Sequence, residues 1–403
     1  MKNIAEKNRY MSLKNFSKST WQVIRIMKKR RILHIQLLPI LSGVQNAMLY
    51  LLQHLSNKKY DISVLSAPDG PLVNRVESLG FRHIALPNFE RLINFKDLLV
   101  LIRLYKVCRK YKFHLVHTHS SKPGLLGRIA AKLAGVPIVV HTVQGFPFHT
   151  SQPKIHQYFY LILEKLGSYF CDMAVSVNKF ERDLAIEKKI LPAEKIITIY
   201  NGIEQPQANR KISKASLGFD DDDVVVGEIA RFSKAKNIIK LIRISSEIAK
   251  NFDNIKFVYV GDGELWQKAK SVVKKQGVED KIILPGWDTD IGAWNELFDI
   301  SVSFSLWEGL SLSILEAMAC AKPIVASDIK GNNEMVINGE NGFLIADHSK
   351  RDFIDKITKL AKNENLRKFM GEKSLKIFEK KFTAERHVRK FNLLYNGLFN
   401  KKL

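Results

Sequence analysis

One segment of the sequence, residues 299–327, constrains the fold more than any other. Its first part, Asp299–Ser305, alternates in polarity and is rich in β-branched and aromatic residues, which predicts a strand ending near Leu306. A helical pattern follows at Ile314–Ala321, and Ile324–Ser327 predicts a second strand after a proline. A strand, a helix and a strand in this order form a βαβ unit, so the sequence predicts an α/β fold with a parallel sheet.

Two carboxylates, Glu308 and Glu316, lie eight positions apart inside this unit. Glu308 follows the strand, at the sheet edge where open parallel sheets bind ligands, and Glu316 lies about one turn into the helix. Between them are amides that a helix leaves without partners, those of Leu310, Ser311, Leu312 and Ser313. Such amides suit a phosphate. Two structural alternatives remain open, because Ser313-x-x-Glu316 also fits a capping box and Glu308 fits a solvated loop charge.

The chain has 403 residues, more than one hydrophobic core usually supports, so two domains are expected. Strand patterns in the first half lie at Ile32–Leu38, Tyr60–Ser66, His114–His117 and Ile138–Val143. Helix patterns alternate with them at Val44–Leu55, Val73–Leu79, Phe95–Tyr111 and Leu125–Ala134. A second alternation starts at Val224. We therefore expect a basic extension at 1–30, Rossmann-like domains at 31–203 and 224–380, a linker at 204–223, and a helix at 381–403 that crosses back towards the first domain.

Two cations follow the first strand of the second half, Val224–Ala230. Arg231 comes directly after this strand and Lys236 five residues later, which suits a diphosphate, although a basic surface loop is the structural alternative. Glycines also stand at strand ends: Gly43 in the first βα turn, and Gly286 after the strand at Ile282. Since the sequence has no GxGxxG at Gly43, a dinucleotide site is not indicated.

Polar side chains gather at the carboxyl ends of two strands in the first half. They are His117, His119, Lys122, His141 and Gln144, with residues 118–124 expected as a loop. In a doubly wound fold these side chains border one crevice, and we assign them to substrate binding. Each histidine taken alone also fits a satisfied core or rim residue.

The formal net charge of +24 and the pI of about 9.7 predict attraction to polyanions, with a generally lysine-rich surface as the alternative. The helix pattern at Phe95–Tyr111 carries Arg and Lys beside Leu, Ile and Val, and the N-terminus and Lys401-Lys402 are basic too. We interpret these features as evidence that the protein binds an anionic membrane surface, although a solvated outer face also fits. The N-terminal apolar stretch is interrupted by Arg25, unlike a signal peptide, and no apolar window reaches about 20 residues, so a peripheral cytoplasmic protein is expected.

Taken together, these segments resemble the GT-B glycosyltransferases, specifically the retaining family 4 type, from about Ile32 to Phe399. The matching segments are Arg231 with Lys236, Val260–Gly263, Pro285-Gly286, Glu308–Glu316, Gly331–Glu334 and Asn338–Gly342. Residues 117–124 are also similar to bacterial enzymes that build capsule or O-antigen units on a polyprenyl diphosphate carrier. The resemblance implies two Rossmann-like domains that face a cleft.

The resemblance also implies residue roles. Arg231 and Lys236 would hold the donor diphosphate, Glu308 the hydroxyls of the donor sugar and Glu316 the ribose hydroxyls. Amides from Leu310 to Ser313 would contact the phosphates, with Gly43 and Gly286 also lining the nucleotide-sugar site. Many members have a His-Gly pair at the end of the strand that corresponds to Ile138–Val143. This chain has Gln144-Gly145 there, and the side chain of Gln144 cannot shuttle a proton.

The expected activity is the retaining transfer of a sugar from a nucleotide sugar, a UDP-sugar by family habit, to a lipid-linked glycan. No metal and no cofactor are expected, because no Asp-x-Asp pair lies in a suitable loop, and no nucleic-acid partner is expected. Two alternatives are kept. One is a sugar-nucleotide epimerase of the same fold, and the other is a basic polyanion-binding protein with a degenerate site.

Overall fold

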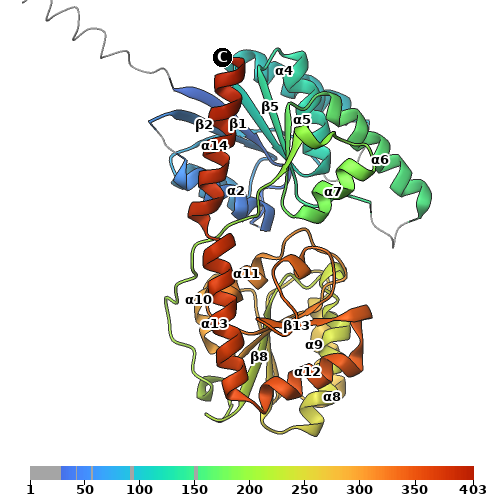
Figure 1. Cartoon of the computed structure of the whole chain (residues 1–403), viewed down its shortest axis with the longest axis vertical. Helices are drawn as coiled ribbons and strands as arrows, with labels where there is room; N and C mark the ends of the chain where they lie inside the picture. Colours follow the sequence, from blue (N-terminus) through green and yellow to red (C-terminus); the bar gives the residue numbers. More distant parts are fainter. Residues whose placement is uncertain (1–28, 42, 56–57, 91–94, 149–152) are drawn as a thin grey trace, which may run out of the picture.

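The computed structural model describes residues 29–41, 43–55, 58–90, 95–148 and 153–403. Most of the predicted basic extension, residues 1–28, therefore lies outside the described residues. Two parallel sheets lie one above the other along the long axis of the molecule, each between layers of helices (Figure 1). This arrangement is the GT-B fold, as predicted.

Within the described residues, the N-terminal sheet has seven strands in the order β3-β2-β1-β4-β5-β6-β7. Their bounds are β1 (Arg30–Ile35), β2 (Tyr60–Ser66), β3 (Arg82–Ala85), β4 (Leu115–His119), β5 (Ile138–Val143), β6 (Met173–Ser176) and β7 (Ile196–Thr198). The helices are α2 (Gly43–His54), α3 (Pro71–Ser78), α4 (Asp97–Tyr111), α5 (Ser121–Leu133), α6 (Lys154–Tyr169) and α7 (Lys179–Glu187).

The C-terminal sheet has six strands among the described residues, in the order β10-β9-β8-β11-β12-β13. Their bounds are β8 (Val224–Ile229), β9 (Ile255–Val260), β10 (Ile282–Gly286), β11 (Ile300–Ser303), β12 (Ile324–Ser327) and β13 (Gly342–Ile345). The helices are α8 (Ile238–Asn251), α9 (Trp266–Gln276), α10 (Ile291–Leu297), α11 (Leu312–Ala319), α12 (Lys350–Ala361), α13 (Glu364–Lys381) and α14 (Ala384–Lys402).

The last helix, α14, does not stay with the C-terminal sheet. Its buried residues, among them Phe391 and Tyr395, belong to the core that α2 and α3 form on one face of the N-terminal sheet. Helices α4 and α5 close a second core on the opposite face, and α6 continues this layer beside α5 (Figure 1). The end of the chain thus completes the domain in which the chain begins.

Several predicted elements have different bounds in the structure. Residues 118–124 are not a loop, because β4 continues to His119 and α5 already begins at Ser121. The strand at Asp299–Ser305 ends earlier than expected, at Ser303. Strands β3, β6 and β13 were not predicted. None of the helices among the described residues has the length and apolar composition needed to cross a bilayer.

Candidate functional site

The carboxyl edges of the two sheets face each other, and the backbones of the two halves approach closely there. A Cβ atom on Gly309, in the loop after β11, would lie 2.2 Å from the carbonyl oxygen of Gln144, which follows β5. A Cβ on Gly43, at the start of α2, would lie 3.7 Å from Leu312 at the start of α11. Gly309 therefore admits no side chain, and Gly43 lies against the helix N-terminus that the sequence assigned to phosphate binding.

Lys236 and Glu308 form an ion pair at this edge. The Nζ atom of Lys236 lies 2.5 Å from Oε1 of Glu308, and Ser305 donates a hydrogen bond of 2.8 Å to the same oxygen. Their side chains are only 18% and 15% exposed, so neither belongs to a solvated surface loop. The pKa of Lys236 is raised by Glu308 and Glu228 although burial opposes the shift, which keeps the ammonium charged.

A third acid, Glu228, lies beside this pair and was not identified from the sequence. It occupies β8 opposite Tyr259 of β9, is buried, and has no hydrogen-bond partner for either carboxyl oxygen within the described residues. Burial raises its pKa to about 8 although Lys236 opposes the shift, so the carboxyl is largely protonated at neutral pH. The only sequence signal was a charged residue in an otherwise apolar strand.

Glu316 projects from α11 near the same cation. Burial raises its pKa to about 7, with Lys236 opposing the shift. The capping-box alternative is wrong, because the helix begins at Leu312 with Ser311 as the residue before it, and no side chain caps it. The hydroxyl of Ser313 instead lies 3.0 Å from that of Ser311. Among the described residues, the first turn of α11 thus has no side-chain cap for its amides.

Arg231 and Gly286, the other two residues predicted at the donor site, have partners of their own. The side chain of Arg231 is 58% exposed and pairs with Glu264 at 3.3 Å. Gly286 ends β10 with φ of 92°, a left-handed conformation that a side chain would strain, and its carbonyl accepts a hydrogen bond from Gly261.

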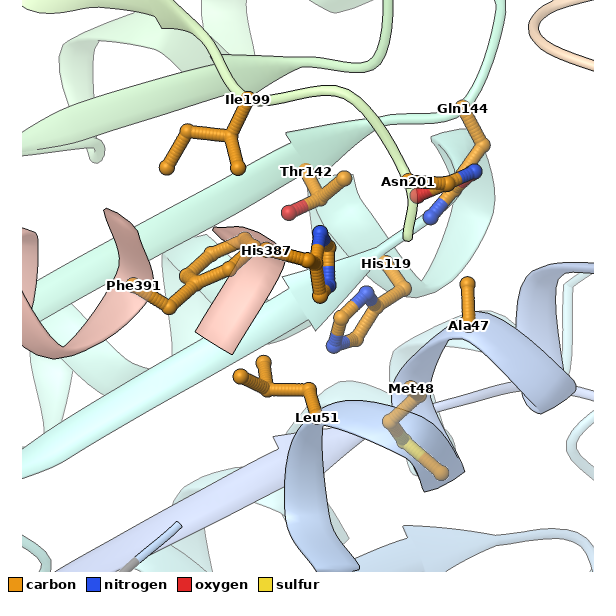
Figure 2. A pocket seen from close by; sticks show the side chains of 10 residues that line it. All are labelled: Ala47, Met48, Leu51, His119, Thr142, Gln144, Ile199, Asn201, His387 and Phe391. Carbon is orange, nitrogen blue, oxygen red and sulfur yellow. The ribbon is translucent and has the colours of Figure 1, made fainter. Parts of the chain in front are cut away.

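On the N-terminal side, a pocket opens between α2, β4, β5 and α14. It is lined by the apolar side chains of Ala47, Met48, Leu51, Ile199 and Phe391 and the polar ones of His119, Thr142, Gln144, Asn201 and His387. Figure 2 shows the rings of His119 and His387 next to each other, with Gln144 and Asn201 towards one end. Two of the predicted substrate residues, His119 and Gln144, therefore line one pocket.

His117 lies deeper than the sequence suggested, because β4 carries it into the core under α14. One ring nitrogen, Nδ1, lies 2.6 Å from the hydroxyl of Tyr395, and the other, Nε2, lies 2.7 Å from that of Thr142. Although His34, His117 and His119 are close enough to suggest a metal site, both nitrogens of His117 are thus engaged. Burial lowers the pKa of all three histidines, so the cluster is neutral.

The other two predicted substrate residues make contacts within the domain. His141 is buried, packs against Gly124 and bonds Thr118 at 2.9 Å. Lys122 lies near the start of α5, where its Nζ atom pairs with Asp97 of α4 at 2.6 Å, and the side chain is 8% exposed. Neither side chain reaches the pocket of Figure 2.

Glu334 joins the two halves and was seen in the sequence only as part of a motif. Its carboxylate accepts hydrogen bonds of 3.0 Å from the amides of Lys179 and Phe180 at the start of α7, and one of 2.7 Å from the hydroxyl of Tyr200. Next to it, Asn178 donates a hydrogen bond of 2.5 Å to the carbonyl of Gly309. These bonds hold the loops that carry Gly309 and Glu334, both from the C-terminal domain, against the N-terminal domain.

The geometry therefore brings together a largely buried cation, two acids with raised pKa values, Glu228 and Glu316, and a helix N-terminus without a side-chain cap. Comparison with known proteins identifies a family for which such a site is expected. Residues 41–205 match the "Glycosyltransferase Family 4" model, and residues 209–376 match the model described as "Glycosyl transferases group 1".

A relative from Escherichia coli, "UDP-Gal:alpha-D-GlcNAc-diphosphoundecaprenol alpha-1,3-galactosyltransferase", is 35% identical over 84% of this chain and 89% of its own length. The chain is a family 4 glycosyltransferase. This glycosyltransferase is also 24% identical to the "Capsular polysaccharide biosynthesis glycosyltransferase CapM" of Staphylococcus aureus, over 92% of this chain and 98% of the relative.

Solved structures share the fold of this family 4 glycosyltransferase. The crystal structure of HepE from Anabaena in complex with UDP-glucose superposes with a TM-score of 0.78 at 19% identity, over 91% of this chain and 99% of HepE. A crystal structure of TarM gives a TM-score of 0.72 at 16% identity, over 93% of this chain and 100% of the other.

Proposed function

We propose that this glycosyltransferase moves a sugar from a UDP-sugar, with retention of configuration, to a glycan linked to polyprenyl diphosphate at the inner face of a bacterial membrane. The observation that carries the donor half is the Lys236–Glu308 ion pair beside the uncapped start of α11. The acceptor half is supported by the 35% identical relative from E. coli, whose name gives a diphosphoundecaprenol acceptor.

In this reaction the ammonium of Lys236 neutralises the diphosphate, and Arg231 turns in from the surface to add a second cation. The amides at the start of α11 receive phosphate oxygens, and the helix dipole favours their charge. Glu308, oriented by Lys236 and Ser305, accepts hydrogen bonds from hydroxyls of the donor sugar. Glu316 does the same for the ribose.

The acceptor hydroxyl attacks the anomeric carbon from the face that the diphosphate leaves, and the leaving phosphate oxygen takes the acceptor proton. No protein nucleophile is needed. Catalysis then rests on positioning and on stabilising the charge that develops on the leaving diphosphate. On the opposite side, Gln144 is half-buried against Gly309 and can donate a hydrogen bond, while His119, which lines the same pocket, is buried.

The test is thermal unfolding with UDP, GDP, ADP and several UDP-sugars, together with transfer to a polyprenyl diphosphate glycan. A ligand at 100 times its Kd adds about 2.7 kcal/mol to the free energy of unfolding. We expect UDP and one UDP-sugar to stabilise the wild type. Lys236→Ala and Glu316→Ala should lose this stabilisation and at least about 100-fold in transfer rate.

The matched control is Lys234→Ala, which removes an exposed lysine from the same short 3-10 turn as Lys236 and should behave as wild type. Full transfer activity in both Lys236→Ala and Glu316→Ala would refute the site. Conversion of a UDP-sugar without an acceptor would favour the epimerase, and no stabilisation by any nucleotide would favour a polyanion-binding protein with a degenerate site.

A further inference from the structure

Helix α6 has its apolar residues on the side that faces solvent. Six large side chains recur at helical spacing along one face and are between 44% and 83% exposed: Ile155, Tyr158, Phe159, Ile162, Leu166 and Tyr169. At 100° per residue they span an arc of about 100°. A surface helix of a water-exposed domain normally shows the reverse pattern, with polar residues outward.

The inward face of α6 explains how such a helix stays attached to the domain. Its buried positions are Glu164 and Gly167. Glu164 forms a buried ion pair with Arg128 of α5 at 3.0 Å, and a Cβ on Gly167 would lie 2.3 Å from the Arg128 guanidinium. A buried charge that lacks its partner is costly. Rotating α6 would separate Glu164 from Arg128, so this pair fixes which face of α6 points away from the sheet.

Helix α4 adds a second exposed row in the same layer. Leu98, Leu99, Ile102 and Tyr105 are exposed on it. Exposed cations, Arg103, Lys106, Arg109 and Lys110, lie on the same helix. The acids of α4 and α6 are Asp97 and Glu164, and each is paired with a cation of α5. The layer therefore presents apolar and positively charged side chains without an exposed acid on either helix.

Helix α6 of this layer adjoins the domain boundary. Its Leu161 packs against the core cluster that contains Val143 and Phe146, and Gln144, which lies between these two residues in the chain, lies against Gly309 of the C-terminal domain. A surface that binds the outward faces of α4 and α6 would thus lie next to the acceptor side of the cleft. By contrast, Lys402, which the sequence suggested as a second membrane contact, is paired with Asp172.

We propose that the outward rows of α6 and α4 are the surface that docks this enzyme on an anionic lipid bilayer, with α6 lying in the plane of the interface. The row on α6 inserts among the acyl chains and the cations on α4 contact the headgroups. The proposal rests on the proposed function in one respect, namely that the acceptor is anchored in the same bilayer.

The experiment is flotation of the full chain with two kinds of vesicle, one of phosphatidylcholine alone and one that also contains about 30–40% phosphatidylglycerol. The phosphatidylglycerol gives the second kind a negative surface potential. We expect wild type to float with the anionic vesicles. Phe159→Glu/Ile162→Glu, at positions about half exposed, should bind at least about tenfold more weakly. Ile155→Glu/Tyr158→Glu, at positions more exposed still, provides a second pair if the first does not fold.

The matched control is Leu393→Glu/Asn400→Glu, which places the same two charges on exposed positions of α14, across the N-terminal sheet, and should float as wild type. Equal flotation of wild type and both double variants would overturn the proposal. So would a wild type that ignores all vesicles but is a dimer by analytical ultracentrifugation and becomes a monomer in either double variant, because the row would then be a contact between two copies.

Transfer to a water-soluble acceptor analogue without vesicles separates this proposal from the proposed function. The double variants should transfer to it at the wild-type rate, because the altered row lies outside the cleft. Vesicle binding without transfer to any acceptor would leave the docking surface standing and refute the function. Transfer by a wild type that never binds vesicles would refute the docking surface alone.

Discussion

Glu228 shows how a single buried residue sets the charge of the donor site. Lys236 lies near three carboxyl groups, and if all three were ionised the cleft would repel a diphosphate. Burial raises the pKa of Glu228 to about 8 and that of Glu316 to about 7, so two of the three acids hold protons over part of the neutral range. The cation then keeps the capacity to bind an anion.

This arrangement predicts a specific pH dependence for Glu228→Gln. In the unfolded chain the carboxyl titrates near its ordinary pKa of 4.5, and in the folded protein near about 8. Between these values the folded state binds more protons, so the free energy of unfolding falls as the pH rises through this window. The glutamine cannot titrate and should remove this part of the fall.

Urea unfolding of wild type and Glu228→Gln from pH 4 to pH 9 measures the difference. Relative to wild type, the variant should gain stability steadily from about pH 5 to about pH 8 and level off above. Glu181, whose pKa burial also raises to about 7, contributes equally to both proteins and cancels in the difference. A constant difference across the range would mean that Glu228 is ionised in the folded protein.

At the scale of single elements, strands β2, β5 and β12 have the bounds that the sequence predicted. Each is a run of β-branched or apolar residues between turn signals, where local pattern and burial agree. The prediction for residues 118–124 was wrong because their polar side chains suggested a loop. In the structure His117 and His119 are buried as neutral rings, and Ser121 starts a helix. Short strands such as β6 carried too few residues for any pattern.

Contacts between elements were harder still to predict, and the start of α7 is the clearest case. Glu334 lies 155 residues after Lys179 in the sequence, and nothing local to either one shows that they meet. The carboxylate satisfies two amides that the helix leaves free, while Asn178 caps a third, the amide of Glu181. Only the folded arrangement of both domains reveals this contact.

Glu334→Ala should therefore weaken the contact between the domains. It removes an anion that accepts two amide bonds and the hydroxyl of Tyr200, and we expect the free energy of unfolding to fall by about 1.5–3 kcal/mol. Tyr200→Phe, which removes only one of the three bonds, should cost less, about 1 kcal/mol. Chemical denaturation measures both. An equal loss in the two variants would locate the stabilisation in the tyrosine bond alone.

For the molecule as a whole, the repeated strand–helix alternation and the Glu308–Glu316 unit were enough to predict the two-sheet fold. That the two domains face a cleft came from the resemblance to the GT-B glycosyltransferases, while the strand ends predicted only where ligands bind within each half. What the sequence could not supply was the depth of each polar residue. That depth depends on α14, which arrives from the other end of the chain and covers His117 with Tyr395 and Phe391.

The crossing of α14 makes the stability of the N-terminal domain depend on the last twenty residues. Phe391 is 2% exposed and packs from α14 into the core on one face of the first sheet, so Phe391→Ala should cost about 3–5 kcal/mol. Phe369→Ala on α13 removes a ring that is half exposed and should change stability by less than about 1 kcal/mol. Hydrogen exchange locates the effect. Amides of β1, β4 and β5 should exchange faster in Phe391→Ala, while those of β8, β9 and β11 keep their protection. Faster exchange in both sheets would mean that the two domains unfold as one unit, since loss of α14 from the first sheet would then release the second as well.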